Sequence, residues 1–288
     1  MPSLQQTRRR IGSVKNTQKI TKAMKLVSAA KLRRAQERIL KARPYAQKME
    51  ALLANLGARV SRDVHPLLAV RPIKKVEILI VAADRGLCGA FNAQIVRRAM
   101  EVVRSQQAQG REVSLTCVGR KSRDFFRRRH LPIRHSVVGI FDKLAFNHAV
   151  DAAKGVADSY LDRTFDECWL IYSEFKSAMT SKIQVKRLIP IQTEAGDAAP
   201  EAGPDYLYEP SDEGLLADIV PRAVEIAIWR ALLESAASEQ GARMMAMDSA
   251  SRNAKEMIAK LTLVYNKTRQ AAITKELMDI VGGAEALK

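Results

Sequence analysis

Residues 76–92 read VEILIVAADRGLCGAFN, and this stretch decides how the middle of the chain folds. The run 76–83 is continuous and apolar, which is typical of a strand that is buried on both faces. Gly86 and Gly89 follow at a turn, and Phe91–Gln107 has the spacing of an amphipathic helix. The turn lacks the Lys-Ser/Thr pair of a P-loop and the full glycine pattern of a dinucleotide site. We therefore interpret it as a tight strand-to-helix turn, with Cys88 as a small packed residue.

The pattern of apolar strand followed by helix continues outward from this stretch over residues 76–192. Further strands are expected at Val113–Val118, Ile133–Val138, Cys168–Phe175 and Ile183–Pro190, and further helices at Lys121–Arg129 and Lys143–Leu161. Apolar strands that alternate with helices favour a mostly parallel sheet covered on both faces. The sequence predicts a Rossmann-like α/β domain over residues 76–192.

Two long helical segments flank this domain, at residues 1–60 and 212–288. A Pro-containing connector at 61–75 and a Gly-, Pro- and acid-rich loop at 193–211 join them to it. Each segment carries apolar residues at steps of three or four, with Pro44 and Pro221 as possible kinks. The first stripe comprises Ile20, Met24, Val27, Ala30, Ala35, Ile39, Ala42, Ala46, Met49, Leu53, Leu56 and Val60. The second comprises Leu216, Ile219, Val224, Ile228, Leu232, Ala236, Met247, Ala250, Ala254, Met257, Leu261, Val264, Thr268 and Ala271.

Helices of this length cannot both bury their stripes inside one domain. The simplest arrangement is an antiparallel coiled coil with the α/β domain at one end. Residues 236–254 are rich in Ala, Gly and Ser, and such small side chains let two helices approach closely.

Composition and charge limit the function classes. The formal net charge is +17, and the basic character belongs chiefly to residues 1–60, which favours an acidic partner. The three cysteines are scattered, as in a reduced cytosolic protein, and the histidines have no metal-ligand spacing. No signal peptide is expected, because charge begins at Arg8 with no apolar run before it. No stretch approaches the ~18 apolar residues of a membrane span, so any membrane association is peripheral.

The residues by themselves leave two other function classes to consider. The charge and the run Arg127–Arg129 are compatible with a basic helical nucleic-acid-binding protein, but aromatic residues make up only 5% and no binding motif is present. An enzyme built on the α/β domain is the second alternative. It lacks a convincing nucleophile and base, a metal cluster or a phosphate loop.

Five blocks of the sequence resemble the γ subunits of F-type ATP synthases. They are Asn16–Val27 (NTQKITKAMKLV), Ala83–Asn92 (ADRGLCGAFN), Asp205–Pro210 (DYLYEP), Ala237–Met247 (ASEQGARMMAM) and Leu263–Ala284 (LVYNKTRQAAITKELMDIVGGA). They follow the family's order and cover essentially the whole chain. Asp279 stands where the family usually has Glu, and the cysteine-bearing insertion of chloroplast γ subunits is absent.

The resemblance implies a central rotor shaft without a catalytic site or cofactor of its own. The helical pair would pass through a ring of three αβ pairs, one copy per ring, and the α/β domain would meet the ε subunit and the membrane c ring. Proton-driven rotation would then yield ATP. No nucleic acid partner is implied, and the expected location is peripheral, at the cytoplasmic face of a bacterial plasma (inner) membrane.

The resemblance also implies contact residues. Lys15, Lys19, Lys22, Met24 and Lys25 would meet an acidic segment of the β subunit, although a charge run of this kind is ordinarily a solvated helix face. Exposed ion pairs contribute only about 0–1 kcal/mol each, which would guide rotation without locking it.

Further implied contacts lie near the C-terminus and in the loop. Arg269, Gln270 and Thr274 match positions that hydrogen-bond a β-subunit loop, the alternative being exposed polar residues of a helix. The loop residues Tyr206, Tyr208 and Glu209 match the family's foot against the c ring and ε, the alternative being an ordinary loop.

Overall fold

The computed structural model describes residues 3–59, 65–191 and 212–285. The chain divides into two compact units. Residues 1–28 and 243–288 form one unit, here called the terminal unit, and residues 29–242 form the other, the central unit. The division cuts through both long helices, α1 (Leu4–Arg59) and α5 (Asp212–Glu285), rather than falling at their ends. Both helices continue through their internal prolines, Pro44 and Pro221.

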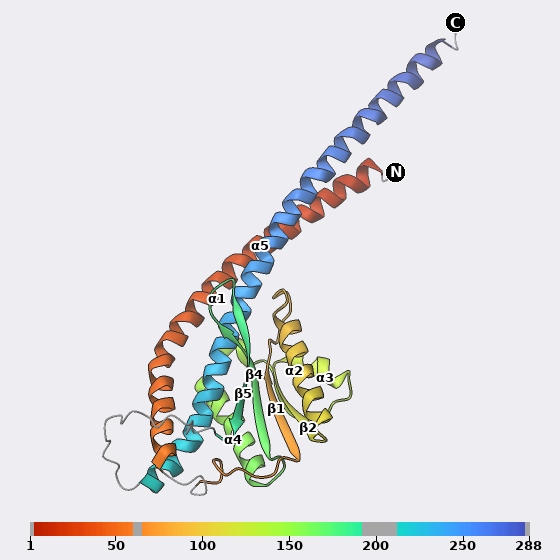
Figure 1. The fold of residues 1–288 in the computed structure, drawn as a ribbon. Coiled ribbons are helices and arrows are strands. Elements are labelled where there is room, and N and C mark those ends of the chain that lie inside the picture. The colour runs from red at the N-terminus through yellow and green to blue at the C-terminus, as the bar shows by residue number, and fades with distance from the viewer. Residues whose placement is uncertain (1–2, 60–64, 192–211, 286–288) are drawn as a thin grey trace. The chain divides into compact units, whose positions relative to one another are not determined.

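A five-stranded sheet lies at the centre of the central unit (Figure 1). Its order is β3-β2-β1-β4-β5, with β1 at Lys75–Val81, β2 at Glu112–Val118, β3 at Ile133–Val137, β4 at Glu167–Phe175 and β5 at Ser181–Ile189. The first four strands are parallel, and β5 pairs antiparallel with β4. The predicted fold class, a mostly parallel sheet with long helices at both ends of the chain, is confirmed.

Helices cover the sheet, and β1 is buried along almost its whole length as a result. Ile78 and Ile80 of β1 pack with Phe91, Ile95 and Ala99 of α2 (Phe91–Ala108). The connections from β1 to β2 and from β2 to β3 run through α2 and α3 (Arg120–Arg127), in one direction across the sheet. The connection from β3 to β4 passes through η2 (Ile140–Lys143) and α4 (Phe146–Leu161) and runs back. Since such crossovers are right-handed, α4 belongs on the face opposite α2.

The loops after β1, β2 and β3 are joined by one carboxylate. Asp84 Oδ1 accepts hydrogen bonds from the backbone N–H of Arg120, at 3.0 Å, and of Gly139, at 2.9 Å. Gly119 adopts φ +96°, and a Cβ atom there would lie 2.1 Å from the carbonyl oxygen of Ala82. These contacts give the segment after β1 a structural role, as the sequence interpretation of a tight turn requires.

Strand β4 pairs with β1 as far as Ile171. Beyond that residue, side chains from the part of α5 in the central unit hydrogen-bond to the backbone of β4. Ser235 Oγ accepts from the backbone N–H of Ser173, at 3.1 Å, and Ser238 Oγ donates to the carbonyl oxygen of Ser173, at 3.2 Å. Glu234 Oε2 accepts from the backbone N–H of Phe175, at 2.9 Å. The small side chains in this part of α5 therefore serve the sheet, and not only the approach of two helices.

In α1 of the central unit, the predicted stripe is buried or half-buried from Ala35 to Leu53, whereas Ala30 is exposed. Ile39, Ala46, Met49 and Leu53 are all buried.

The first part of α1, in the terminal unit, buries a different stripe from the predicted one. Ile20 and Val27 are 60% and 57% exposed, whereas Thr7, Thr21 and Ser28 are buried. Apart from Met24, a half-buried residue of the predicted stripe, the buried and half-buried positions follow alternating steps of three and four residues, namely Leu4, Thr7, Ile11, Val14, Gln18, Thr21, Lys25 and Ser28. This is the spacing of a coiled-coil seam. The prediction selected the more apolar of two faces, but the partner helix covers the more polar one.

Candidate functional site

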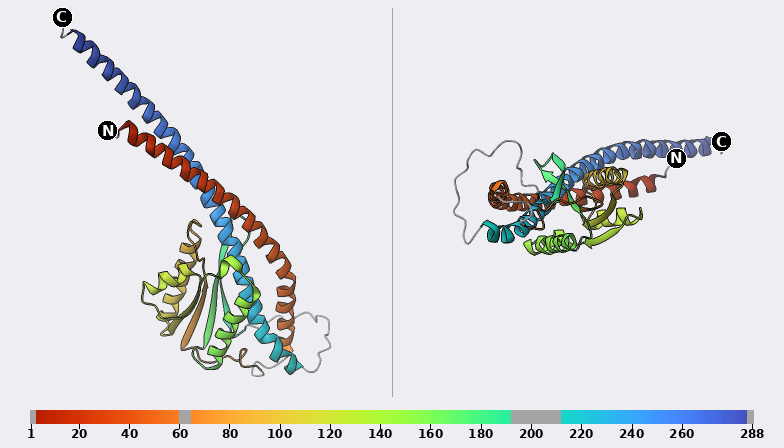
Figure 2. Two further views of the ribbon diagram at one scale, coloured as in Figure 1. Left: turned by 180° about the vertical axis from the view of Figure 1, so that it is seen from behind. Right: turned by 60° about the horizontal axis from the view of Figure 1, so that its bottom comes forward.

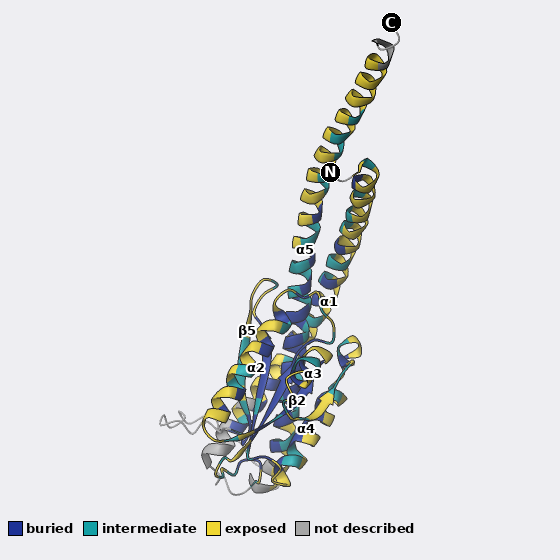
Figure 3. Ribbon diagram, turned by 90° about the vertical axis from the view of Figure 1, so that its right-hand side faces the viewer, coloured by how far each residue is buried: buried dark blue, intermediate teal, exposed yellow. Residues whose placement is uncertain are grey.

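The terminal unit holds every predicted contact residue that the structure describes. Figures 1 and 2 show the first part of α1 beside α5, with the end of α5 extending past the start of α1. Arg243, Met247 and Ala254 are buried residues of α5 in this unit. From Met247 on, the buried positions have heptad spacing. Half-buried residues continue their heptad at Ser251, Ile258, Leu261, Tyr265, Thr268 and Ala272. From Ile273 to Gly282 every residue is exposed (Figure 3).

Three of the predicted lysines form an exposed row on α1. Lys15, Lys19 and Lys22 are exposed at i, i+4 and i+7, which places them on one side of the helix. Lys15 and Lys19 line a shallow hollow together with Lys255 and Ile258 of α5. Their ammonium groups therefore concentrate positive charge at one level of the helix pair.

Lys25 differs from the other lysines because it already has a partner. Its Nζ lies 2.6 Å from Oδ1 of Asp248, and Arg252 lies 3.5 Å from the other carboxylate oxygen. The hydrogen bond from Lys25 lowers the pKa of the Asp248 carboxyl below its ordinary value. Lys25 thus stabilises the helix pair, and its predicted contact with a β subunit stays a prediction. Met24, next to it, is half-buried.

The C-terminal contact residues lie at a different level of the helix pair. Arg269 and Gln270 are exposed, and the hydroxyl of Thr274 donates to the carbonyl oxygen of Gln270, at 3.0 Å. In an antiparallel pair the numbers of facing residues add to a constant, here 25 + 248 = 273. Lys15 therefore faces residue 258, and Arg269 faces Leu4. At 1.5 Å per residue, the two levels are about 16 Å apart.

Sequence reasoning missed a set of exposed apolar residues in the terminal unit. On α1 they are Ile20, Leu26 and Val27. On α5 they are Met257, Leu263, Val264, Ile273, Leu277, Met278, Ile280 and Val281. Exposed fractions reach 71% at Leu263 and 70% at Ile280. Apolar residues outside the heptad seam were the available signal. Ile20, Val27, Met257 and Val264 were expected in the seam instead, and the others were assigned to neither face. Apolar groups gathered on a surface mark a site of interaction with another macromolecule.

Three further features of the described residues concern metal binding, thiol exposure and membrane spanning. Among the described residues no group of His, Cys, Asp and Glu is arranged to hold a metal ion. All three thiols are buried, and burial raises the pKa of Cys117 to about 12 and raises that of Cys168 well above its ordinary value. No helix in the described ranges is long and apolar enough to cross a membrane. The predicted foot residues Tyr206, Tyr208 and Glu209 lie outside the described residues.

Comparison with known proteins shows to which family the chain belongs. The model of the ATP synthase family matches residues 3–287. An ATP synthase gamma chain from an Anaeromyxobacter species is 53% identical over 291 residues, with both chains covered completely. One from Heliobacterium modesticaldum is 49% identical over 293 residues, again with both chains covered completely.

The chain belongs to the ATP synthase γ-chain family. It is a γ subunit, the central stalk of the complex. A chain of the Tetrahymena thermophila mitochondrial ATP synthase, from a structure of the central stalk and c ring, is 28% identical with a TM-score of 0.61. The match covers 81% of this γ chain and 99% of that one. In the Euglena gracilis mitochondrial enzyme the corresponding values are 21% identity, a TM-score of 0.71, and coverage of 99% and 94%. At that identity the likeness concerns the fold alone. The nucleic-acid alternative has no support from these comparisons.

Proposed function

We propose that this γ chain is the torque-transmitting shaft of its ATP synthase and carries no catalytic residue itself. The observation that carries this proposal is the exposed apolar surface of the terminal unit, above all along α5 from Ile273 to Val281. A lone helix in water gains no burial from such residues, and most helical stability in proteins comes from packing. The end of α5 therefore requires a surrounding protein surface, as a shaft inside a ring of subunits would have.

The partners follow from this role. One copy enters a ring of three αβ pairs, and the central unit meets the c ring and the ε subunit. The chain is held peripherally at the cytoplasmic face of a bacterial plasma membrane through the c ring. Proton flow turns the ring and the shaft together, and ATP forms on the αβ ring.

Rotation of the shaft is coupled to the conformation of the β subunits because the surface of the terminal unit is not the same on all sides. A β subunit meets the lysine row Lys15, Lys19 and Lys22 at one shaft angle and apolar residues such as Leu263 at another. Conformations of β shift only as far as their contacts with the shaft differ in free energy. Exposed ion pairs of about 0–1 kcal/mol each are compatible with repeated making and breaking during rotation.

Reconstitution tests the proposal directly. The purified chain is mixed with α and β subunits of a compatible enzyme, and stoichiometry and ATPase rate are measured on the same sample. We expect one copy per three αβ pairs and an ATPase rate that rises when the chain is added. A chain that neither joins the ring nor changes its ATPase, while a known γ chain does both, contradicts the shaft role.

The same assay tests the C-terminal contact residues. The double variant Arg269→Ala and Gln270→Ala removes a planar donor fork and an amide from the exposed face of α5. Loss of a charged hydrogen bond costs about 1.5–3 kcal/mol, so we expect the reconstituted ATPase rate to fall roughly tenfold or more. Lys267→Ala, also exposed on α5, is the matched control. Equal rates for the double variant and the control would remove these two residues from the proposed contact.

A further inference from the structure

Helix α5 is held in two different ways along its course through the central unit. Over residues 220–233 every buried side chain is apolar, as at Val224, Ile228 and Leu232. Over residues 234–241 every buried residue is small or polar. This second part lies just before Arg243, where the terminal unit begins on α5. It therefore depends on hydrogen bonds and close backbone contact at the point where the helix leaves the central unit.

The hydrogen bonds of this second part all reach one edge of strand β4. Ser235 and Ser238 bond to the N–H and the carbonyl oxygen of Ser173, and Glu234 accepts from the N–H of Phe175. Alternate residues of a strand direct their backbone groups to the same edge. Hydrogen bonds are directional, whereas apolar packing is not. These three bonds therefore oppose rotation of α5 about its own axis, which the apolar part of the helix does less well.

Gly241 adds a close backbone contact to these bonds. A Cβ atom at this position would lie 3.1 Å from the carbonyl oxygen of Ala178, in the turn between β4 and β5. The backbone of α5 and that turn thus meet without a side chain of Gly241 between them. Close-packed groups of this kind transmit strain, so a force on the sheet reaches α5 here directly.

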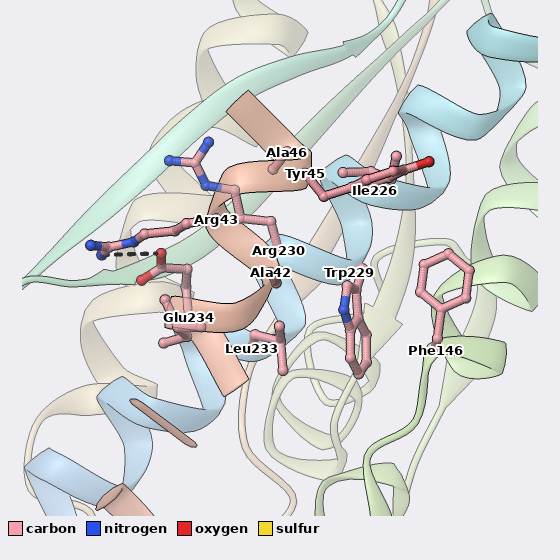
Figure 4. A pocket seen from close by; sticks show the side chains of 11 residues that line it. Ala42, Arg43, Tyr45, Ala46, Phe146, Ile226, Trp229, Arg230, Leu233 and Glu234 are labelled. Atoms are coloured by element: carbon pink, nitrogen blue, oxygen red, sulfur yellow. Dashed lines mark ion pairs between the residues drawn. The ribbon is translucent and has the colours of Figure 1, made fainter. Parts of the chain in front are cut away.

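Helix α1 has weaker polar contacts with the same unit. Arg43 of α1 lies 3.8 Å from Glu234 of α5 (Figure 4), and Arg38 donates to the carbonyl oxygen of Leu144 at 3.3 Å. Both arginines are exposed, unlike the serines that hold α5. Exposed charges contribute little to stability through such contacts. They hold α1 against the unit less firmly than the buried bonds hold α5.

A cavity also separates part of α1 from α5. It measures about 200 Å³ and is lined by Ala42 and Ala46 of α1, by Trp229 and Leu233 of α5 and by Phe146 of α4 (Figure 4). Atoms beside a void have no packing partners on that side. Contact between the two helices is therefore incomplete here, whereas α5 meets the sheet and its β4–β5 turn directly.

We propose that α5, rather than α1, is the helix through which torque passes between the sheet and the terminal unit. The side chains of Glu234, Ser235 and Ser238, bound to the backbone of Ser173 and Phe175, are here called the α5 anchor. Its serines are positioning residues, because they fix the angle of α5 in the central unit and touch no substrate. The inference rests on the proposed shaft role and adds to it the route that the torque takes.

The double variant Ser235→Ala and Ser238→Ala tests the anchor, because it removes two of the three hydrogen bonds. The ATPase rate of its complex with α and β subunits, in which the central unit turns without load, should stay within about twofold of the wild-type rate. ATP synthesis by the complete enzyme in lipid vesicles requires torque to cross the anchor. We expect it to fall about fivefold or more, as for changes on a coupling route.

Two control variants separate torque transfer from stability and from α1. Ile228→Ala truncates a fully buried side chain of α5 outside the anchor, so it should destabilise the isolated chain comparably or more. Arg38→Ala removes a contact of α1. Both should keep ATP synthesis within about twofold of the wild-type rate. Thermal unfolding of each isolated variant shows that it is folded and measures its loss of stability.

Each outcome has a definite meaning. Unchanged ATP synthesis in the double variant overturns the inference, and so does an equal loss in Ile228→Ala, because stability alone would then explain the effect. A loss in Arg38→Ala as large as that in the double variant places α1 on the route and overturns it as well. In all three cases a wild-type chain that supports ATPase and synthesis leaves the shaft role standing. A wild-type chain that supports neither overturns the shaft role and this inference with it.

Discussion

Lys25 and Asp248 join the two helices of the terminal unit by a direct ion pair of 2.6 Å. The contact lies at the seam, where α1 is otherwise polar or small at Thr21 and Ser28. A polar contact in a coiled-coil seam costs stability compared with an apolar one, but it specifies which residues face each other. At the residue scale, this pair sets the register that places Arg269 opposite Leu4.

The ion pair predicts how acid affects the terminal unit. The hydrogen bond from Lys25 lowers the folded-state pKa of Asp248 below its ordinary value of 3.8. The stabilisation from the ion pair is therefore complete above the pKa of Asp248 in the unfolded chain. It is lost as the pH falls through the lower pKa of Asp248 in the folded chain. We expect Asp248→Asn to lower the thermal unfolding midpoint at pH 7, and the two midpoints to converge below pH 3.8.

The matched control for this measurement is Glu37→Gln. Glu37 pairs with Arg33 on the exposed surface of α1, at 3.4 Å. Because exposed pairs contribute little, this substitution should leave the unfolding midpoint unchanged at every pH. A constant difference between Asp248→Asn and the wild type down to pH 2 would show that the carboxylate charge is not what Lys25 recognises.

At the scale of elements, α5 replaces a missing strand. Where β1 ends, the edge of β4 would leave backbone groups of Ser173 and Phe175 without partners, and side chains of α5 supply them. Gly241 belongs to the same contact, because a Cβ atom there would lie 3.1 Å from the carbonyl oxygen of Ala178. The sheet and α5 are thus held together by specific polar groups as well as by apolar packing.

Removing one of these groups tests the contact. Ser235→Ala leaves the buried N–H of Ser173 without an acceptor, which should lower the free energy of unfolding by about 1–3 kcal/mol. Chemical denaturation of the isolated chain measures the loss. Ser249→Ala, at an exposed position of the same helix, should change the stability by no more than about 0.5 kcal/mol. Equal stability of the two variants would contradict the role given to Ser235.

The two faces of the helix pair predict opposite behaviour for two apolar residues. Met247 is 5% exposed at the seam, so Met247→Ala should destabilise the isolated chain by about 2 kcal/mol or more. Ile20 is 60% exposed, so Ile20→Ala should change its stability by less than about 0.5 kcal/mol. Ile20→Ala should instead weaken assembly with α and β subunits. A larger loss of stability for Ile20→Ala than for Met247→Ala would contradict the burial assigned to these two positions.

At the scale of the whole molecule, the terminal unit leaves apolar surface exposed that the isolated chain cannot bury. The seam of α5 ends near Ala272, and the helix continues to Glu285 with exposed residues such as Leu277 and Ile280. Such a surface favours association, and the family to which the chain belongs supplies the assembly in which it would be covered.

Truncation after Ala272 separates folding from assembly. The shortened chain should unfold within about 2 °C of the full chain, because residues 273–282 are exposed. In complex with α and β subunits, however, it should dissociate at a clearly lower temperature, because the apolar contacts of Ile273 to Val281 are lost. Thermal dissociation of the complex, followed by size-exclusion chromatography, measures the second effect. An unchanged dissociation temperature would show that these residues remain uncovered in the complex.

The strands and helices of the central unit were predictable from the sequence within a few residues. The apolar run 76–83 corresponds to β1 at Lys75–Val81, and 113–118 corresponds to β2 at Glu112–Val118. A strand buried on both faces needs apolar side chains at nearly every position, so its sequence is unambiguous. The family resemblance and the row of lysines on α1 could likewise be identified from the sequence.

The seam of the terminal unit and the partners of individual side chains depended on tertiary structure. Both Ile20 and Thr21 lie on helical stripes, and periodicity alone does not say which stripe meets the second helix. Lys25 was expected on a surface for another subunit, but Asp248, 223 residues away in the chain, lies within 2.6 Å of it. Helical spacing is a local property that the sequence determines, whereas the choice of buried face is made by long-range packing against a second helix.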